Sequence, residues 1–140
     1  MTTMKITIGN VKARAELLEK EAPVTCARMK EAMPIEGMLT SAKVCNNEVL
    51  FSVPFFIDQE ENVRLEVPGD IGFWNGPQTI CIFYDEPKGT LGPMGIWARI
   101  TDNLEGFQRE ANKVFANQGT RIKFELETGR QGRNSWGQNG

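Results

Sequence analysis

Residues 67–84 have the sequence VPGDIGFWNGPQTICIFY, and this stretch decides the fold. The Pro-Gly-Asp triplet at 68–70 is a turn signal, and the next four residues alternate at the two-residue period of a strand. Asn-Gly-Pro at 75–77 is a second turn signal. Residues 79–84 are apolar on both faces, as a central strand of a barrel can be. The stretch therefore predicts a strand, a tight turn and a second strand that is buried on both sides.

The composition is that of one soluble globular domain. The chain has 140 residues, of which 40% are hydrophobic and 24% are charged. The net charge of −2 offers no basic field for a nucleic acid, and no apolar run approaches the roughly 18 residues of a membrane span. The first residues, MTTMKITIG, lack the basic-then-apolar layout of a signal peptide. We therefore expect a cytoplasmic protein with neither a nucleic acid nor a membrane as its partner.

The chain contains no histidine, which limits the chemistry that it can perform. Ser-His-Asp and Cys-His devices are excluded, as is every metal site that needs an imidazole. The three cysteines, Cys26, Cys45 and Cys81, are widely spaced and odd in number, which favours reduced thiols over a disulfide framework. They also cannot form a four-thiolate zinc site. We therefore expect no metal and no other cofactor.

The rest of the chain predicts more strands and two helices. The expected elements are strands at 4–8 and 11–17, a helix at 23–33, strands at 35–45, 48–53, 63–67, 71–74, 79–84 and 96–101, a helix from 104 to about 118, and a strand at 122–126. The second helix has an apolar stripe that runs from Leu104 to Phe115. Antiparallel strands interrupted by two helices favour a mainly β fold, a closed or nearly closed barrel with a helix over each end.

Two segments fall outside this pattern. Residues 85–93, DEPKGTLGP, form a loop of a kind that often flanks a site. Residues 128–140, TGRQGRNSWGQNG, have no periodicity and little apolar content. We expect the domain to comprise residues 1–127, followed by a polar tail that contains Trp136 and could be disordered.

Three segments of the sequence resemble segments of the cyclophilins: residues 11–34, 69–84 and 95–115. The first resembles the cyclophilin opening strand and helix, the second the strands beside the prolyl pocket, and the third the strand and helix that follow. The motif GDIGFW at residues 69–74 is similar to a motif that is typical of small microbial cyclophilin-like families of unknown function. The resemblance covers most of residues 1–127. It implies a closed antiparallel cyclophilin-like β-barrel with two helices, and it implies where a cleft would lie.

The chain departs from the cyclophilins at the residues that catalyse prolyl isomerisation. In that family a Phe-His-Arg motif supplies an arginine that donates a hydrogen bond to the substrate carbonyl. Residues 41–53, SAKVCNNEVLFSV, have neither the histidine nor the arginine, and their only basic residue is Lys43. Lysine lacks the planar fork of a guanidinium and is a poor replacement for it. The glutamine of the cyclophilin pocket strand corresponds to Thr79 or Cys81 in this sequence, and the histidine of the pocket rim is absent. The resemblance therefore does not extend to prolyl isomerase activity.

Eight side chains are candidates for contact with a ligand. The aromatic candidates are Trp74, Phe73, Tyr84, Phe55 and Phe56. The basic candidates are Arg99, Lys43 and Arg64. Arg99 lies two residues from Trp97, and a guanidinium on the same face as an aromatic ring could grip a carboxylate. The alternative is that the aromatic residues fill the barrel and that the charges form its wet face. Asp70 is expected to cap its own turn.

The residues leave three functions open. The favoured hypothesis is a domain that binds a small organic metabolite in the cleft beside residues 73–84, without prolyl isomerase activity. The first alternative is an enzyme, a peptidyl-prolyl cis-trans isomerase. The second is an interaction module whose exposed face forms a homo-oligomer. Whether the protein catalyses any reaction is left open at this point, because a fold analogy alone does not establish a function.

Overall fold

The computed structural model describes residues 1–42, 47–87, 92–116 and 118–127, and these form nine strands and two helices. In chain order they are β1 (Thr3–Ile8), β2 (Val11–Leu17), α1 (Pro23–Ala32), β3 (Ile35–Ser41), β4 (Glu48–Ser52), β5 (Val63–Arg64), β6 (Asp70–Trp74), β7 (Thr79–Phe83), β8 (Met94–Asp102), α2 (Leu104–Asn112) and β9 (Thr120–Leu126). Lys43, Cys45 and the tail at 128–140 with Trp136 lie outside the described residues.

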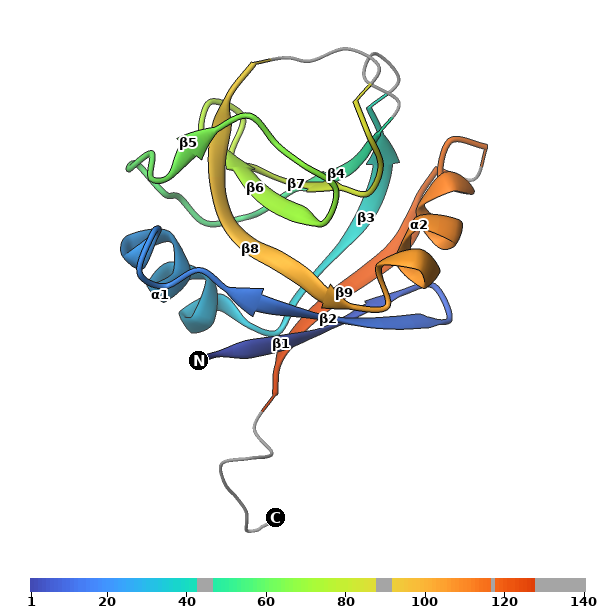
Figure 1. The fold of residues 1–140 in the computed structure, drawn as a ribbon, viewed down its shortest axis with the longest axis horizontal. Helices are drawn as coiled ribbons and strands as arrows, with labels where there is room; N and C mark the ends of the chain where they lie inside the picture. Colours follow the sequence, from blue (N-terminus) through green and yellow to red (C-terminus); the bar gives the residue numbers. More distant parts are fainter. Residues whose placement is uncertain (43–46, 88–91, 117, 128–140) are drawn as a thin grey trace, which may run out of the picture.

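Eight of the strands close into an antiparallel barrel (Figure 1). Their order is β2-β1-β9-β3-β4-β7-β6-β8, and pairing of β2 with β8 completes the ring. The long strand β8 makes this possible, because it pairs with β6 along one edge and with β5 and then β2 along the other. The predicted mainly β, closed barrel with two helices is confirmed.

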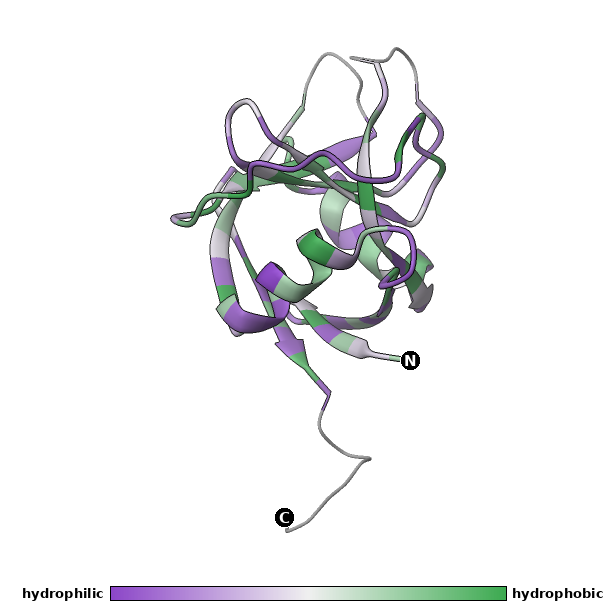
Figure 2. Cartoon of the chain, turned by 90° about the vertical axis from the view of Figure 1, so that its left-hand side faces the viewer, coloured by the Kyte–Doolittle hydropathy of each residue, from purple (hydrophilic) through white to green (hydrophobic). Residues whose placement is uncertain are grey.

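The core lies inside the barrel and is built from alternate residues of each strand. Coloured by hydropathy, the strands switch between hydrophilic and hydrophobic residues along their length (Figure 2). At the centre, the ring of Phe124 meets those of Phe51 and Trp97 edge-on, with centroids 5.8 and 6.2 Å away. Every residue of β7 is buried: Ile80 and Ile82 join this core, while Cys81 and its neighbour Phe83 join a second, smaller apolar cluster. The prediction that this strand is buried on both sides is confirmed.

The helices flank the barrel on opposite sides in Figure 1. Helix α1 begins at Pro23, as predicted, and buries Cys26 and Met29. Helix α2 is capped by Asn103, whose side-chain oxygen accepts a hydrogen bond from the Gly106 N–H at 3.1 Å.

The structure corrects three details of the sequence analysis. Helix α2 ends at Asn112, so Phe115 does not continue the apolar stripe and is 55% exposed. The strand expected at 63–67 pairs with β8 only over Val63–Arg64. Trp97 does not share a face with Arg99, because the β6–β8 register shifts between Ile71 and Gly72 and the indole faces the core.

Candidate anion-binding site

One buried carboxylate at the start of β6 holds two guanidinium groups. Asp70 is completely buried and accepts hydrogen bonds from both terminal nitrogens of Arg64, at 2.7 and 3.2 Å. It also accepts from Arg99 at 3.4 Å and from the backbone N–H of Val67 at 2.8 Å. Two parallel contacts to one carboxylate fix the plane of the Arg64 guanidinium as well as its position.

The turn before β6 explains why Asp70 lies there. Gly69 has a φ of +99°, a conformation that glycine adopts without strain, and Asp70 donates its backbone N–H to the Val67 carbonyl at 3.1 Å. The Asp70 side chain then closes the same turn through the Val67 N–H. The predicted capping role of Asp70 is confirmed. Its ion pairs with two arginines were not predicted.

Strand register extends this cluster into a row of charges. Asp70 on β6 lies opposite Arg99 on β8, and Arg99 lies opposite Glu16 on β2. Residues that lie directly opposite one another in antiparallel strands share a face of the sheet. The row therefore consists of Asp70, Arg99 and Glu16 on three neighbouring strands, and Arg64 is bound to Asp70.

Both guanidiniums have surface left for a ligand. The side chains of Arg64 and Arg99 are 37% and 47% exposed, whereas Asp70 has no exposed surface. A guanidinium carries five N–H donors, and the contacts to Asp70 occupy only some of them. Two arginines and one aspartate leave one net positive charge around Asp70, which suits an anion, while Glu16 at the far end brings the whole row to zero.

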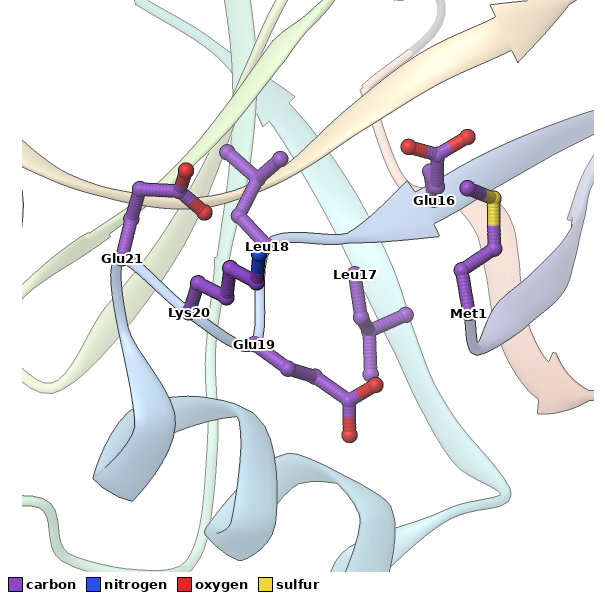
Figure 3. A pocket seen from close by; sticks show the side chains of 7 residues that line it. All are labelled: Met1, Glu16, Leu17, Leu18, Glu19, Lys20 and Glu21. Atoms are coloured by element: carbon purple, nitrogen blue, oxygen red, sulfur yellow. The ribbon is translucent and has the colours of Figure 1, made fainter.

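A pocket of about 430 Å³ opens beside Glu16 (Figure 3). Its lining residues are Met1, Glu16, Leu17, Leu18, Glu19, Lys20 and Glu21. Figure 3 shows the side chains of Glu16, Leu18 and Glu21 on one side of the chain and those of Leu17 and Glu19 on the other. Glu19 is bound to Lys30 at 2.5 Å, and this hydrogen bond is the main reason that the pKa of Glu19 is lowered. Glu16 thus connects the charge row to a partly apolar pocket.

The other predicted site residues are scattered. Phe73 and Tyr84 lie in the core and are 2% and 3% exposed, so little of their surface could touch a ligand. Trp74 and Phe56 are exposed, and Phe55 is half-buried beneath the guanidinium of Arg28. Trp74 lies at the opposite end of β6 from Asp70. Lys43 is outside the described residues. The structure brings together Arg64 and Arg99, and a ligand role for the aromatic side chains stays a prediction.

Glu16 was missed in the sequence analysis, where it stood as an ordinary polar position of the strand at 11–17. No local signal could have found it, because its position beside Arg99 depends on the pairing of β2 with β8. Asp70 offered a partial signal, since an aspartate after Pro-Gly predicts a turn contact but no ion pair.

The described thiols and carboxylates do not point to other chemistry. Cys26 and Cys81 are buried, and burial raises the pKa of the Cys26 thiol to about 12, which keeps it protonated. Within the described ranges, no three Cys, Asp or Glu side chains are grouped as metal ligands would be. In the same residues, no helix is long and apolar enough to cross a membrane.

Comparison with known proteins identifies the family and the fold. A family model described as cyclophilin-like matches residues 2–114. A hypothetical protein from Archaeoglobus fulgidus has a similar structure, with a TM-score of 0.62, 20% identity, and coverage of 89% of this chain and 93% of the other. McbB in complex with tryptophan is also similar, with a TM-score of 0.72, 14% identity, and coverage of 94% and 47% respectively. This chain therefore spans about half the length of McbB. No curated protein matches the sequence.

Proposed function

The chain belongs to the cyclophilin-like family, and we propose that its barrel binds a small organic carboxylate through Arg64 and Arg99. The observation that carries the proposal is the single buried carboxylate of Asp70 that positions two half-exposed guanidiniums. Arginine matches the planar, bidentate geometry of a carboxylate better than lysine does. A binding group that is already fixed loses less conformational entropy when the ligand arrives.

An α-amino acid is the ligand class that fits this surface best. Its carboxylate would bind Arg99 and Arg64, and its ammonium group would bind Glu16, which lies opposite Arg99 on β2. The amino-acid side chain would then occupy the pocket beside Glu16, where Leu18 and Met1 provide apolar surface. McbB, a structural neighbour, was solved with tryptophan, so tryptophan is the first amino acid to test.

We do not assign prolyl isomerase activity to this barrel. The chain has no histidine, and residues 41–53 lack the arginine that cyclophilins direct at the substrate carbonyl. The proposal is therefore one of binding, with no reaction assigned.

Calorimetric titration tests the proposal with three related probes. We expect L-tryptophan to bind, tryptamine to bind weakly because it lacks the carboxylate, and indole-3-propionate to bind with intermediate strength because it lacks the ammonium group. Arg99→Gln and Arg64→Gln should each weaken tryptophan about tenfold, which corresponds to about 1.4 kcal/mol. Arg109→Gln on α2 is the matched control, because its side chain is 68% exposed and pairs only weakly with Glu105. Tryptamine binding as tightly as tryptophan would refute the carboxylate site.

A further inference from the structure

The segment at 63–67 turns its apolar side chains to the solvent. Val63, Leu65 and Val67 are 50%, 59% and 43% exposed. The two charged residues between them point the other way: Arg64 reaches Asp70, and Glu66 is 8% exposed. Apolar residues arranged as a continuous stripe on an exposed edge are typical of an interaction surface. We call these five residues the Val-Arg-Leu-Glu-Val segment.

The first two residues of this segment form β5 at the end of the sheet, and residues 65–67 continue beyond it. Strand β5 is the last strand in the order, so within the described residues only one of its edges pairs with another strand. Glu66 as a whole residue is 8% exposed, and its carboxylate makes no hydrogen bond or ion pair with any described residue. A carboxylate without a described partner at this open edge is available to a cation supplied from outside the chain.

The order of the five residues makes the segment complementary to itself. When two copies lie antiparallel around a two-fold axis at Leu65, Val63 faces Val67 of the second copy and Leu65 faces its own equivalent. In the same pairing, Arg64 faces Glu66 of the second copy. Apolar pairs and opposite charges that lie directly across neighbouring strands are both favourable. A two-fold axis requires this kind of self-complementarity from the surface that it relates.

We propose that two copies of this chain associate through the Val-Arg-Leu-Glu-Val segment to form a symmetric dimer. Val24 is another exposed apolar residue, at 45%, and its backbone N–H donates at 3.1 Å to Glu61, which precedes the segment by two positions. The exposed stripe is narrow, so the dimer should be reversible, with a dissociation constant between about 1 μM and about 1 mM. The inference does not rest on the proposed function, but the two share Arg64, which would face Glu66 of the second copy in the dimer and the carboxylate of the ligand in the site.

The two-fold axis at Leu65 permits a sharp test by sedimentation equilibrium. Leu65→Lys places two positive charges opposite each other, and Leu65→Glu places two negative charges there, so each variant should be monomeric. An equimolar mixture should form a heterodimer, because lysine then faces glutamate. Phe56→Lys and Phe56→Glu are the matched controls, since Phe56 is 66% exposed and lies outside the segment. Both controls should dimerise as the wild type does.

Several results would overturn the dimer proposal. Wild-type protein that is monomeric up to about 1 mM excludes it, since that limit corresponds to about −4.1 kcal/mol. Dimerisation of both Leu65 variants would place the interface elsewhere, and so would a mixture that stays monomeric. Circular dichroism checks that each variant is folded. If the Leu65 variants do not fold, the doubly substituted pair Val63→Lys/Val67→Lys and Val63→Glu/Val67→Glu repeats the same test, because these two positions also face each other across the axis.

Discussion

The carboxylate of Glu61 accepts hydrogen bonds from the backbone N–H and the hydroxyl of Thr25, at 2.7 and 2.8 Å. The same carboxylate accepts from the Val24 N–H at 3.1 Å. These donors lie in the first turn of α1, and the residue at its N-cap, Ala22, has no side chain that could satisfy them. Glu61 therefore caps the N-terminus of α1 from a loop that is distant in the sequence. Its negative charge also interacts favourably with the positive end of the helix dipole.

The first prediction concerns this cap. Glu61→Ala leaves the N–H groups of Val24 and Thr25 without their acceptor, so it should lower the free energy of unfolding by about 0.5–2 kcal/mol, the range for loss of an N-cap. Urea unfolding followed by circular dichroism measures the difference. Glu60→Ala is the matched control, because Glu60 is exposed and belongs to the same loop. Equal effects of the two substitutions would show that Glu61 has no capping role.

The second prediction concerns the pH dependence of the same contact. Burial of Glu61 tends to raise its pKa, but hydrogen bonds from Thr25 and Val24 outweigh burial, and the pKa is lowered. In the unfolded chain the carboxyl has a pKa of about 4.3. Because the folded pKa is lower, the stabilisation is complete above the unfolded value and is lost as the pH falls through the folded one.

Urea unfolding of wild type and Glu61→Gln between about pH 7 and about pH 3 measures this loss. The stability difference between the two proteins should be constant at neutral pH and should shrink in acid, because protonated Glu61 resembles glutamine. A difference that grows as the pH falls would contradict the assignment of the lowered pKa.

These contacts show what the sequence can predict. Pro23 marks the start of α1 in the sequence, and alternation of apolar residues marks most strands, because these signals are local. The cap from Glu61 depends on a hydrogen bond between residues 36 positions apart, which no local pattern contains. The closure of the barrel was predicted from the order of elements and from the family resemblance, whereas the pairing of β2 with β8 that achieves it was not.

The candidate site was predicted in part for the same reason. Arg64 and Arg99 were candidates because they are charges on strand positions, but their meeting at Asp70 follows from the turn and the register. Trp97 was expected beside Arg99 by simple alternation, and a register shift in the β6–β8 pair removes it. Alternation alone also cannot decide which face is inside, so Phe73, a predicted ligand contact, proved to be a core residue.

The third prediction concerns Asp70. Asp70→Asn removes the charge that two guanidiniums and the Val67 N–H share, so it should lower the free energy of unfolding by about 1–3 kcal/mol, the range for a buried hydrogen-bonded group. Denaturant unfolding measures the change. Asp58→Asn is the control, because Asp58 is exposed. A variant as stable as the wild type would show that Asp70 does not organise the cluster.

The fourth prediction concerns prolyl isomerase activity. In the presence of the protein, the prolyl bond of a proline-containing tetrapeptide should isomerise no faster than it does alone. The uncatalysed time constant is roughly tens to hundreds of seconds. The reason is the absence of a histidine and of an arginine in residues 41–53. Lys43→Ala, Arg64→Gln and the wild type should give the same rate. Turnover comparable to that of ordinary cyclophilins would reverse the prediction, and loss of that turnover in one variant would identify the donor.

The last prediction compares Trp74 with Trp97, two tryptophans on the same barrel. Trp97 has no exposed surface and packs edge-on against Phe124, so Trp97→Ala should cost about 3–5 kcal/mol, the range for emptying a large core site. Trp74 is 42% exposed at the end of β6, so Trp74→Ala should cost clearly less. Denaturant unfolding of the two variants beside the wild type measures both values.

A measurement of ligand affinity in Trp74→Ala, beside its stability, decides whether Trp74 contacts the ligand. If Trp74 forms a wall of the ligand site, Trp74→Ala should weaken binding by on the order of 1–3 kcal/mol, the value for one large apolar contact. Since Arg64 and Arg99 lie toward the other end of β6, loss of affinity in both Trp74→Ala and Arg99→Gln would require a ligand that extends along this strand. Unchanged affinity in Trp74→Ala, together with a weakened Arg99→Gln, would confine the site to the charge row and the pocket beside Glu16.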